Sequence, residues 1–188
     1  MFSHIKNGSF GRASEYASAE DFCRVFNQDM DVLYWLALTL TGDETKAEQC
    51  FVSGLAECIE GNSVFKDWAR SWSKRVVIKN AIRIILPRPG STPTPLSDTQ
   101  PASQAEAAMT ALKAMRPFDR FVFVMSVLEG YTDRDSAILL GCSPTDLVKA
   151  RFRAVQEIAR AIEVSAGLPE VPGHGLQQIG VLNEARIA

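Results

Sequence analysis

Apolar residues recur at steps of three and four along most of the chain, a spacing that places side chains on one face of an α-helix. Between residues 43 and 60 this stripe consists of Ala47, Cys50, Phe51, Gly54, Leu55, Cys58 and Ile59. Thr41 or Asp43 suits the N-cap of this helix, and the pair Gly61-Asn62 suits its end. The pattern therefore predicts a helix across this segment.

Similar stripes lie on either side of that segment. The stripe before it ends at Gly42 and comprises Met30, Leu33, Tyr34, Ala37, Leu38 and Thr41. The stripe after it ends before Pro87 and comprises Phe65, Trp68, Trp72, Val76 and Asn80, with Val77, Ala81, Ile84 and Ile85 beside it. The run FVFVMSVL at 121–128 has the composition of a strand, but helix signals surround it. We therefore expect an all-α fold.

Glycine and proline divide the chain into parts. Residues 1–17 read as a flexible arm, and residues 18–86 read as a helical domain. Residues 87–103 hold five of the nine prolines, a density that excludes a helix interior or a central strand and indicates a linker. Residues 104–164 are helical again, and residues 165–188 form a tail. The expected architecture is two small helical domains joined by a Pro-rich linker.

The segment from 131 to 162 has the signals of two helices separated by a tight turn. Thr132 or Asp133 can cap a short helix, and Gly141 can adopt the backbone conformation that a tight turn requires. Ser143 can cap a second helix that has Pro144 at its first position, where a missing N–H is tolerated. A helix, a three-residue turn and a longer helix match the helix-turn-helix arrangement that binds DNA.

The second of these helices would enter the major groove through its N-terminal half. At 100° per residue its outward side carries Thr145, Asp146, Lys149, Arg153, Gln156 and Arg160, and its packed side carries Val148, Phe152, Val155, Ala159 and Ile162. Arg151 lies off the outward side, where it serves either a phosphate or an internal ion pair. The candidate DNA-binding residues here are Arg134, Ser143, Thr145, Asp146, Lys149, Arg151 and Arg153. The alternative is a helical hairpin whose basic residues are merely solvated.

Charge is distributed unevenly along the chain, although its net value is only −2. Residues 15–60 contain ten acidic and two basic residues, whereas residues 64–88 contain seven basic residues and one acidic residue. Adjacent acidic and basic segments indicate separate surfaces for separate partners, or one surface that covers the other. The alternative is two solvated helix faces that neutralise each other.

Other functional classes find little support in the sequence. The four cysteines lack the spacing of a zinc site, and we expect small buried thiols. His4 and His174 lie in predicted flexible ends, and the chain has no phosphate-binding glycine loop and no nucleophile motif. No signal peptide is visible, and no apolar run approaches the length of a membrane span. We expect a cytoplasmic protein that is not an enzyme, is not inserted in a membrane and has no cofactor.

The stretch ALKAMRPFDRFVFVMSVLEGYTDRDSAILLGCSPTDLVKARFRA resembles the C-terminal domain of extracytoplasmic-function sigma factors. The residues that carry this resemblance are Leu112, Arg116, Val122, Val124, Leu128, Glu129, Gly130, Tyr131, Asp135, Ala137, Leu140, Gly141, Cys142, Ser143, Arg153 and Ala154. The resemblance implies a recognition helix that binds the minus-thirty-five promoter element.

The stretch LYWLALTLTGDETKAEQCFVSGL is similar, more loosely, to the other domain of the same family. There the next helix and its loop melt the minus-ten element, and Phe65, Trp68 and Asn80 fit that helix. Aromatic rings stack on single-stranded bases while Lys and Arg follow the backbone. The candidate residues for this contact are Lys66, Arg70, Trp72, Lys74 and Lys79. The alternative is that both Trp68 and Trp72 belong to the core.

Two stretches of the chain, one in each predicted domain, depart from the family's pattern. The resemblance implies a polymerase-binding surface at Glu48, Gln49, Val52 and Leu55, but the family usually has Asp and Gln where this chain has Gln49 and Val52. In the recognition helix, an ungapped match puts Val148 and Ala150 where the family often has basic residues. A shift by one residue would instead bring Lys149 and Arg151 to those positions.

Two hypotheses follow. The first is a sigma-factor-like transcription initiation protein that binds double-stranded promoter DNA and core RNA polymerase. The second, which the departures at Gln49 and Val52 favour, is a sigma-like DNA-binding or protein-interaction regulator that no longer initiates transcription. The resemblance also implies an inhibitory partner of the anti-sigma type. Intramolecular masking by the acidic segment at 15–60 is the alternative to that partner.

Overall fold

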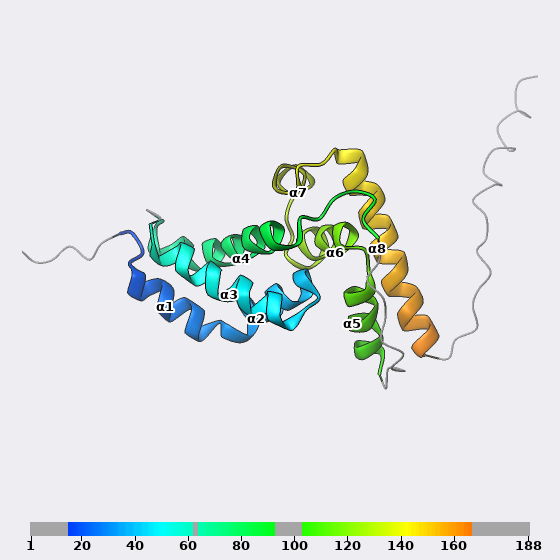
Figure 1. Ribbon diagram of the computed structural model, residues 1–188, viewed down its shortest axis with the longest axis horizontal. Helices are drawn as coiled ribbons and strands as arrows, with labels where there is room; N and C mark the ends of the chain where they lie inside the picture. Colours follow the sequence, from blue (N-terminus) through cyan, green and yellow to red (C-terminus); the bar gives the residue numbers. More distant parts are fainter. Residues whose placement is uncertain (1–14, 62–63, 93–102, 167–188) are drawn as a thin grey trace, which may run out of the picture.

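The computed structural model describes residues 15–61, 64–92 and 103–166, which form helices and, apart from an isolated bridge between Tyr16 and Phe65, no strand (Figure 1). The first helical group comprises α1 (Ala19–Gln28), α2 (Met30–Thr41), α3 (Glu44–Ile59), the short 3₁₀ helix η1 (Lys66–Trp68) and α4 (Ala69–Ile85). The second helical group comprises α5 (Gln104–Ala114), α6 (Pro117–Phe123), the π-helical segment η2 (Val124–Leu128), α7 (Asp133–Leu140) and α8 (Pro144–Ser165). The all-α prediction is confirmed. Most of the predicted arm, linker and tail lies outside the described residues.

Local sequence signals set the ends of the first helices. The Ser18 hydroxyl accepts a hydrogen bond from the Asp21 N–H at 3.2 Å, and the Asp21 carboxylate accepts one from the Ser18 N–H at 2.9 Å, which makes a capping box for α1. Gly42 ends α2 with a φ of 69°, a left-handed conformation that glycine adopts without a steric penalty. Asp43 caps α3 by accepting from the Lys46 N–H at 2.8 Å. These two boundaries are where the sequence predicts them.

The core of the first group lies between α1, α2, α3 and α4. Its most buried side chains include Phe22, Phe26, Leu33, Leu36, Leu40, Ala47, Cys50, Val76, Val77 and Ile78. Gly54 lets α3 approach α4 closely, since a Cβ there would lie 3.3 Å from a methyl carbon of Val77. Each large side chain buried in this way contributes about 1.5–3 kcal/mol to folding. The buried face of α3 follows the predicted stripe except at its end, where Ile59 is 40% exposed.

The core of the second group forms where α5 and α6 pack against α8. Its most buried side chains include Leu112, Met115, Phe118, Phe121, Val122, Met125, Leu147, Ala150 and Ala154. The run at 121–128 is helical, as its neighbours predict. Its second part is wound as a π-helix, in which the Glu129 N–H donates to the Val124 carbonyl at 2.9 Å.

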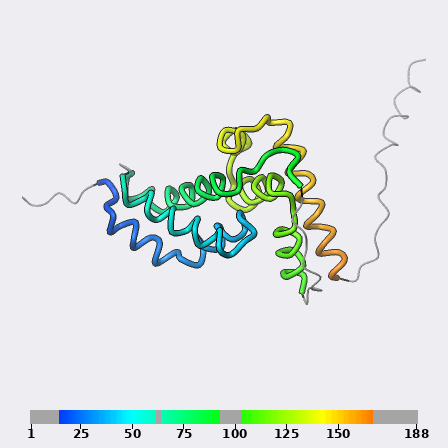
Figure 2. Tube along the Cα trace, in the orientation of Figure 1, coloured from blue at the N-terminus to red at the C-terminus, as the bar shows by residue number. Residues whose placement is uncertain are grey.

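The two groups meet where the C-terminus of α2 lies against α6 (Figure 2). Arg120 of α6 is only 2% exposed, and its guanidinium donates to the carbonyl oxygens of Leu40 at 3.1 Å and Thr41 at 3.0 Å. It also donates to the carbonyl of Lys113 at 2.8 Å. Gly42 makes room for this group, because a Cβ there would lie 2.7 Å from Nη1 of Arg120. A cation at the carbonyl end of a helix is favourable, so Arg120 ties α2 to the second group.

A second polar link joins the same two groups. Lys74 of α4 donates to the carboxylate of Glu129, which follows η2, at 2.8 Å. The buried apolar side chains of both groups also form one continuous cluster. Burial lowers the pKa of Arg120 to about 10, as expected for a cation that is held by neutral carbonyls. The two helical groups are therefore packed against each other.

Candidate nucleic-acid interface

The geometry from 132 to 146 positions the predicted DNA-binding segment. Thr132 is the N-cap of α7, and Gly141 ends this helix in a left-handed conformation with a φ of 61°. Ser143 caps α8 by accepting from the Asp146 N–H at 3.1 Å, and its hydroxyl donates to the Asp146 carboxylate at 2.7 Å. Two helices joined by three residues, Gly141 to Ser143, therefore follow each other as the sequence predicts.

The packed face of α8 differs from the predicted one. Its buried residues are Leu147, Ala150 and Ala154, which lie against the other helices of the second group. Of the five residues predicted to pack, Ile162 is partly buried, whereas the exposed ones are Val148, Phe152, Val155 and Ala159. Phe152 is 64% exposed. The prediction was wrong because it followed hydrophobicity, while the close approach of α5 and α6 selects the small alanines.

The predicted outward side of α8 is only partly outward. Its exposed members are Thr145, Lys149, Gln156 and Arg160, while Asp146 and Arg153 are half-buried. In the ungapped match to the family, the two positions that are often basic fall on Val148, which is exposed, and on Ala150, which is buried. In the match shifted by one residue they fall on Lys149, which is exposed, and on Arg151, which is half-buried.

Two of the predicted DNA-binding arginines bind carboxylates of this chain. Arg153 makes a two-pronged contact with the buried Asp119, at 2.7 Å and 3.0 Å, and Arg116 reaches the same carboxylate at 3.1 Å. Hydrogen bonding to Asp119 raises the pKa of Arg153 above its usual value. Arg151 binds both carboxylate oxygens of Asp133 on α7. The predicted outward position of Arg153 is wrong, and Arg151 makes the internal ion pair that was one of its two alternatives.

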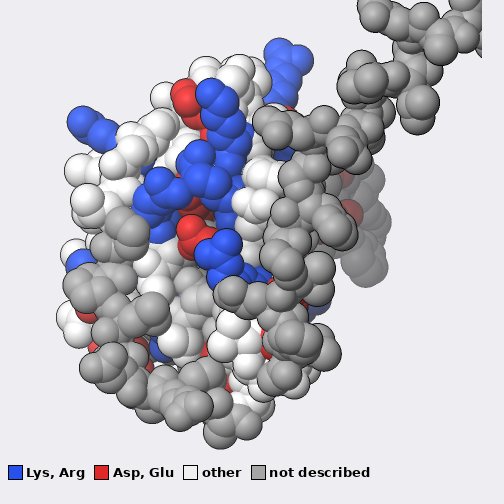
Figure 3. Space-filling model, turned by 90° about the vertical axis from the view of Figure 1, so that its right-hand side faces the viewer, with Lys and Arg blue, Asp and Glu red and all other residues white. Residues whose placement is uncertain are grey.

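Other cations near this segment have no such partner. Lys149 and Arg134 are exposed and form no ion pair within the part of the chain that the structure describes. Figure 3 views the side of the molecule on which α8 lies and shows Lys and Arg side chains gathered on it, with acidic groups between them. The cations of this face are therefore partly neutralised within the protein.

The predicted basic surface of α4 and η1 is neutralised more completely. Each of its four cations contacts a carboxylate, in the pairs Lys66 with Asp21, Arg70 with Asp29, Lys74 with Glu129, and Lys79 with Glu57. Burial alone would raise the pKa of Glu57, but hydrogen bonds from Lys79, Arg83 and Asn80 lower it below its usual value. The acidic segment of the chain thus supplies three of the four carboxylates that bind these cations.

The two tryptophans of this segment lie in different surroundings. Trp68 is 61% exposed and meets Phe65 edge-on, with ring centroids 5.3 Å apart, while Phe65 stacks on Tyr16 at 4.9 Å. Trp72 is half-buried and packs against the core, and its Nε1 is buried without a hydrogen-bond partner among the described residues. The alternative in which both tryptophans are core residues therefore fails for Trp68.

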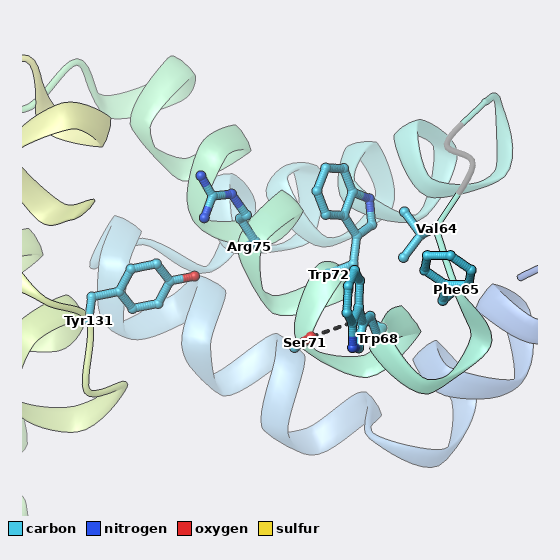
Figure 4. Close-up of a pocket in the computed structure, with 7 residues that line it drawn as sticks. All are labelled: Val64, Phe65, Trp68, Ser71, Trp72, Arg75 and Tyr131. Carbon is cyan, nitrogen blue, oxygen red and sulfur yellow. Dashed lines mark hydrogen bonds between the residues drawn. The ribbon is translucent and has the colours of Figure 1, made fainter. Parts of the chain in front are cut away.

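A pocket of about 460 Å³ opens beside these rings (Figure 4). Its lining residues are Val64, Phe65, Trp68, Ser71, Trp72, Arg75 and Tyr131. Arg75 and Tyr131 were not among the predicted site residues. Arg75 belongs to the basic segment at 64–88. Tyr131 comes from the other helical group, and no local sequence signal places Tyr131 beside α4. Burial raises the pKa of Tyr131 above its usual value.

The predicted polymerase-binding residues lie along α3. Glu48, Gln49 and Val52 are exposed on one side of this helix, and Val52 is 59% exposed. Leu55 is half-buried and packs against the core. The structure therefore brings three of the four onto one surface.

The described ranges contain no candidate metal site and no candidate membrane span. Their His, Cys, Asp and Glu side chains form no group of three or more that could hold a metal ion. Their helices include none that is both long and apolar enough to cross a bilayer.

The chain matches no known protein-family model, and no curated protein is significantly similar to it in sequence. Among solved structures, it is similar to the sigma factor RpoE of Bartonella quintana, solved in complex with the anti-sigma factor NepR. The two chains are 17% identical and align with a TM-score of 0.47, over 77% of this chain and 98% of that chain.

Proposed function

We propose that this protein is a sigma-factor-like transcription initiation protein, which binds promoter DNA through α7 and α8 and core RNA polymerase through α3. It acts by binding and performs no catalysis of its own. The observation that carries the proposal is the N-terminal half of α8, where Thr145 and Lys149 are exposed while Leu147 packs inward. This is the arrangement that a recognition helix needs to reach base edges in a major groove.

A second DNA contact on α4 requires an exchange of ion-pair partners. The cations of the α4 surface are bound to carboxylates, so DNA phosphates would have to replace these partners. The cations of these pairs are 35–64% exposed, although the carboxylates are only 15–25% exposed. Ion pairs at the protein surface contribute about 0–1 kcal/mol each, so the exposed cations can exchange partners. The exposed ring of Trp68 offers a stacking surface for an unpaired base.

Run-off transcription with bacterial core polymerase tests the proposal. The full chain should program the polymerase on genomic DNA, and Lys149→Ala should weaken promoter binding by about tenfold, since a lost base contact is worth roughly 1–3 kcal/mol. Arg24→Ala is the matched control, because Arg24 is an exposed cation of α1 and lies outside the proposed DNA and polymerase surfaces. Absence of transcripts together with absence of polymerase binding at modest salt would refute the proposal.

A second candidate function rests on the exposed apolar residues of α7 and α8. Ile138 is 67% exposed, Phe152 is 64% exposed, and Val148 and Val155 are about half exposed. A row of this kind is more typical of a protein contact than of a DNA contact. It supports a sigma-like regulator that binds another protein, including an inhibitor of the anti-sigma type, and no longer initiates transcription.

Polymerase affinity separates the two functions. If the chain is a regulator without polymerase contact, Gln49→Asp combined with Val52→Gln should create binding to core polymerase that the native chain lacks. If the native chain already binds core polymerase well, the regulator function is refuted. Both residues are exposed, so the double variant should retain the stability of the native protein.

A further inference from the structure

The pocket beside α4 is lined by aromatic side chains that suit a flat ligand. Phe65, Trp68 and Trp72 come from the first helical group, and Tyr131 comes from the second group. Figure 4 shows Arg75 and the Tyr131 hydroxyl at one end of the pocket, Val64 and Phe65 at the other, and the two indole rings between them. The volume of about 460 Å³ lies within the usual range of ligand sites, roughly 300–1,000 Å³.

The charged group of this pocket is a hydrogen-bond donor without a partner. Arg75 forms no hydrogen bond or ion pair within the described ranges, in contrast to its neighbours Arg70, Lys74 and Lys79, each of which binds a carboxylate. The Ser71 hydroxyl already donates to the Trp68 carbonyl at 3.0 Å, and the indole N–H of Trp72 is buried beneath the surface of the pocket. The pocket therefore offers one guanidinium to acceptor atoms.

The lining contains no carboxylate. A ligand that suits this lining has a planar ring for the aromatic side chains and an anionic group for the guanidinium. A nucleotide has both features, because its base can stack between aromatic rings and its phosphate can accept paired hydrogen bonds from an arginine.

We propose that this pocket binds a free mononucleotide, with the base among the rings of Phe65, Trp68 and Trp72 and the phosphate at Arg75. This site shares Trp68 with the proposed contact to an unpaired base, but it is independent of Lys149 and of duplex binding through α7 and α8. A free nucleotide fits better than a nucleotide within a strand, because the lining holds a single cation, Arg75, and so offers a place for one phosphate. Since the ligand contacts both groups, its binding stabilises their packed arrangement.

Calorimetric titration of the full chain with the four ribonucleoside monophosphates tests the site. At least one should bind saturably, and the matching nucleoside should bind at least about tenfold more weakly because it lacks the phosphate. Arg75→Gln should weaken nucleotide binding by a similar factor. Arg88→Gln is the matched control, since Arg88 is an exposed cation just beyond the far end of α4 and should leave binding unchanged.

Trp68→Ala separates a binding role of the rings from a structural one. Trp68 is 61% exposed, so its truncation should leave the thermal midpoint of the free protein close to the native value. Nucleotide affinity should nevertheless fall, because the base loses a stacking surface. Unchanged nucleotide affinity in this variant would overturn the assignment of the base to these rings.

Two further outcomes would overturn the proposal. One is the absence of saturable binding for all four monophosphates at millimolar concentration. The other is binding of a thymidine oligonucleotide without binding of any mononucleotide, which would make the pocket a strand site. Duplex promoter binding, measured on the same Arg75→Gln preparation, reports the proposed function separately, because α7 and α8 lie outside the pocket.

Discussion

Replacing Arg120 with methionine removes the cation at the junction of the two helical groups and keeps a long, unbranched side chain. In the native protein the guanidinium binds three carbonyl oxygens, those of Leu40, Thr41 and Lys113, at 2.8–3.1 Å. In the variant these oxygens lose their donor at a position where the native side chain is only 2% exposed. We therefore expect Arg120→Met to lower the free energy of unfolding.

The size of this loss follows from two opposing contributions. Leaving a buried acceptor without its donor costs about 1–3 kcal/mol, so three acceptors cost about 3–9 kcal/mol, and about 6 kcal/mol at the middle of that range. Burial lowers the pKa of Arg120 from its usual 12.5 to about 10, which corresponds to about 3 kcal/mol of unfavourable burial that methionine relieves. The expected net loss is about 2–3 kcal/mol.

Urea unfolding of the full chain, followed by far-ultraviolet circular dichroism, measures this loss. Arg120→Lys should lie between the native protein and Arg120→Met, because one ammonium group cannot replace the fixed fork of a guanidinium. Arg24→Met is the control, since the Arg24 side chain is 56% exposed and its ion pairs should contribute less than about 1 kcal/mol. If Arg120→Met is as stable as the native protein, the three hydrogen bonds do not hold the helical groups together.

Three further expectations concern other parts of the fold. Hydrogen bonds from Ser18 lower the pKa of Asp21 from its usual 3.8 to about 2. The stabilisation that these bonds give to α1 is therefore complete above pH 3.8 and disappears as the pH falls towards 2. Asp21→Ala should remove this part of the pH dependence of the urea midpoint. Burial raises the pKa of Cys50 to about 12, so a thiol reagent at pH 8 should modify the exposed Cys23 and leave Cys50 unmodified until the protein unfolds. Gly42→Ala should lower the free energy of unfolding by about 1–2 kcal/mol in the same urea assay, because it strains a left-handed backbone and crowds the group that α6 inserts there.

The features that the sequence predicts correctly are local ones. Asp43 and Ser143 cap helices because a short polar side chain can reach an N–H three residues ahead, and this depends only on the residues beside it. Gly42 and Gly141 end helices for an equally local reason. The all-α class follows from many such signals that agree with one another.

The features that the sequence does not predict depend on distant residues. The packed face of α8 is chosen by how closely α5 and α6 approach, and this favours Ala150 and Ala154 over the more hydrophobic Phe152. Arg153 binds Asp119, which lies 34 positions earlier in the sequence, and no residue near Arg153 in the chain indicates that partner. The pocket was missed for the same reason, because Tyr131 meets α4 only through the packing of the two helical groups.

Two guanidinium groups, those of Arg116 and Arg153, share the single carboxylate of Asp119. Glu157 of α8 acts on the same three side chains, so two carboxylates face two guanidinium groups. If a phosphate binds Arg153, the buried carboxylate of Asp119 keeps Arg116 as its counterion and is not left uncompensated. Arg153 can therefore exchange its partner without leaving an unpaired charge in the second helical group.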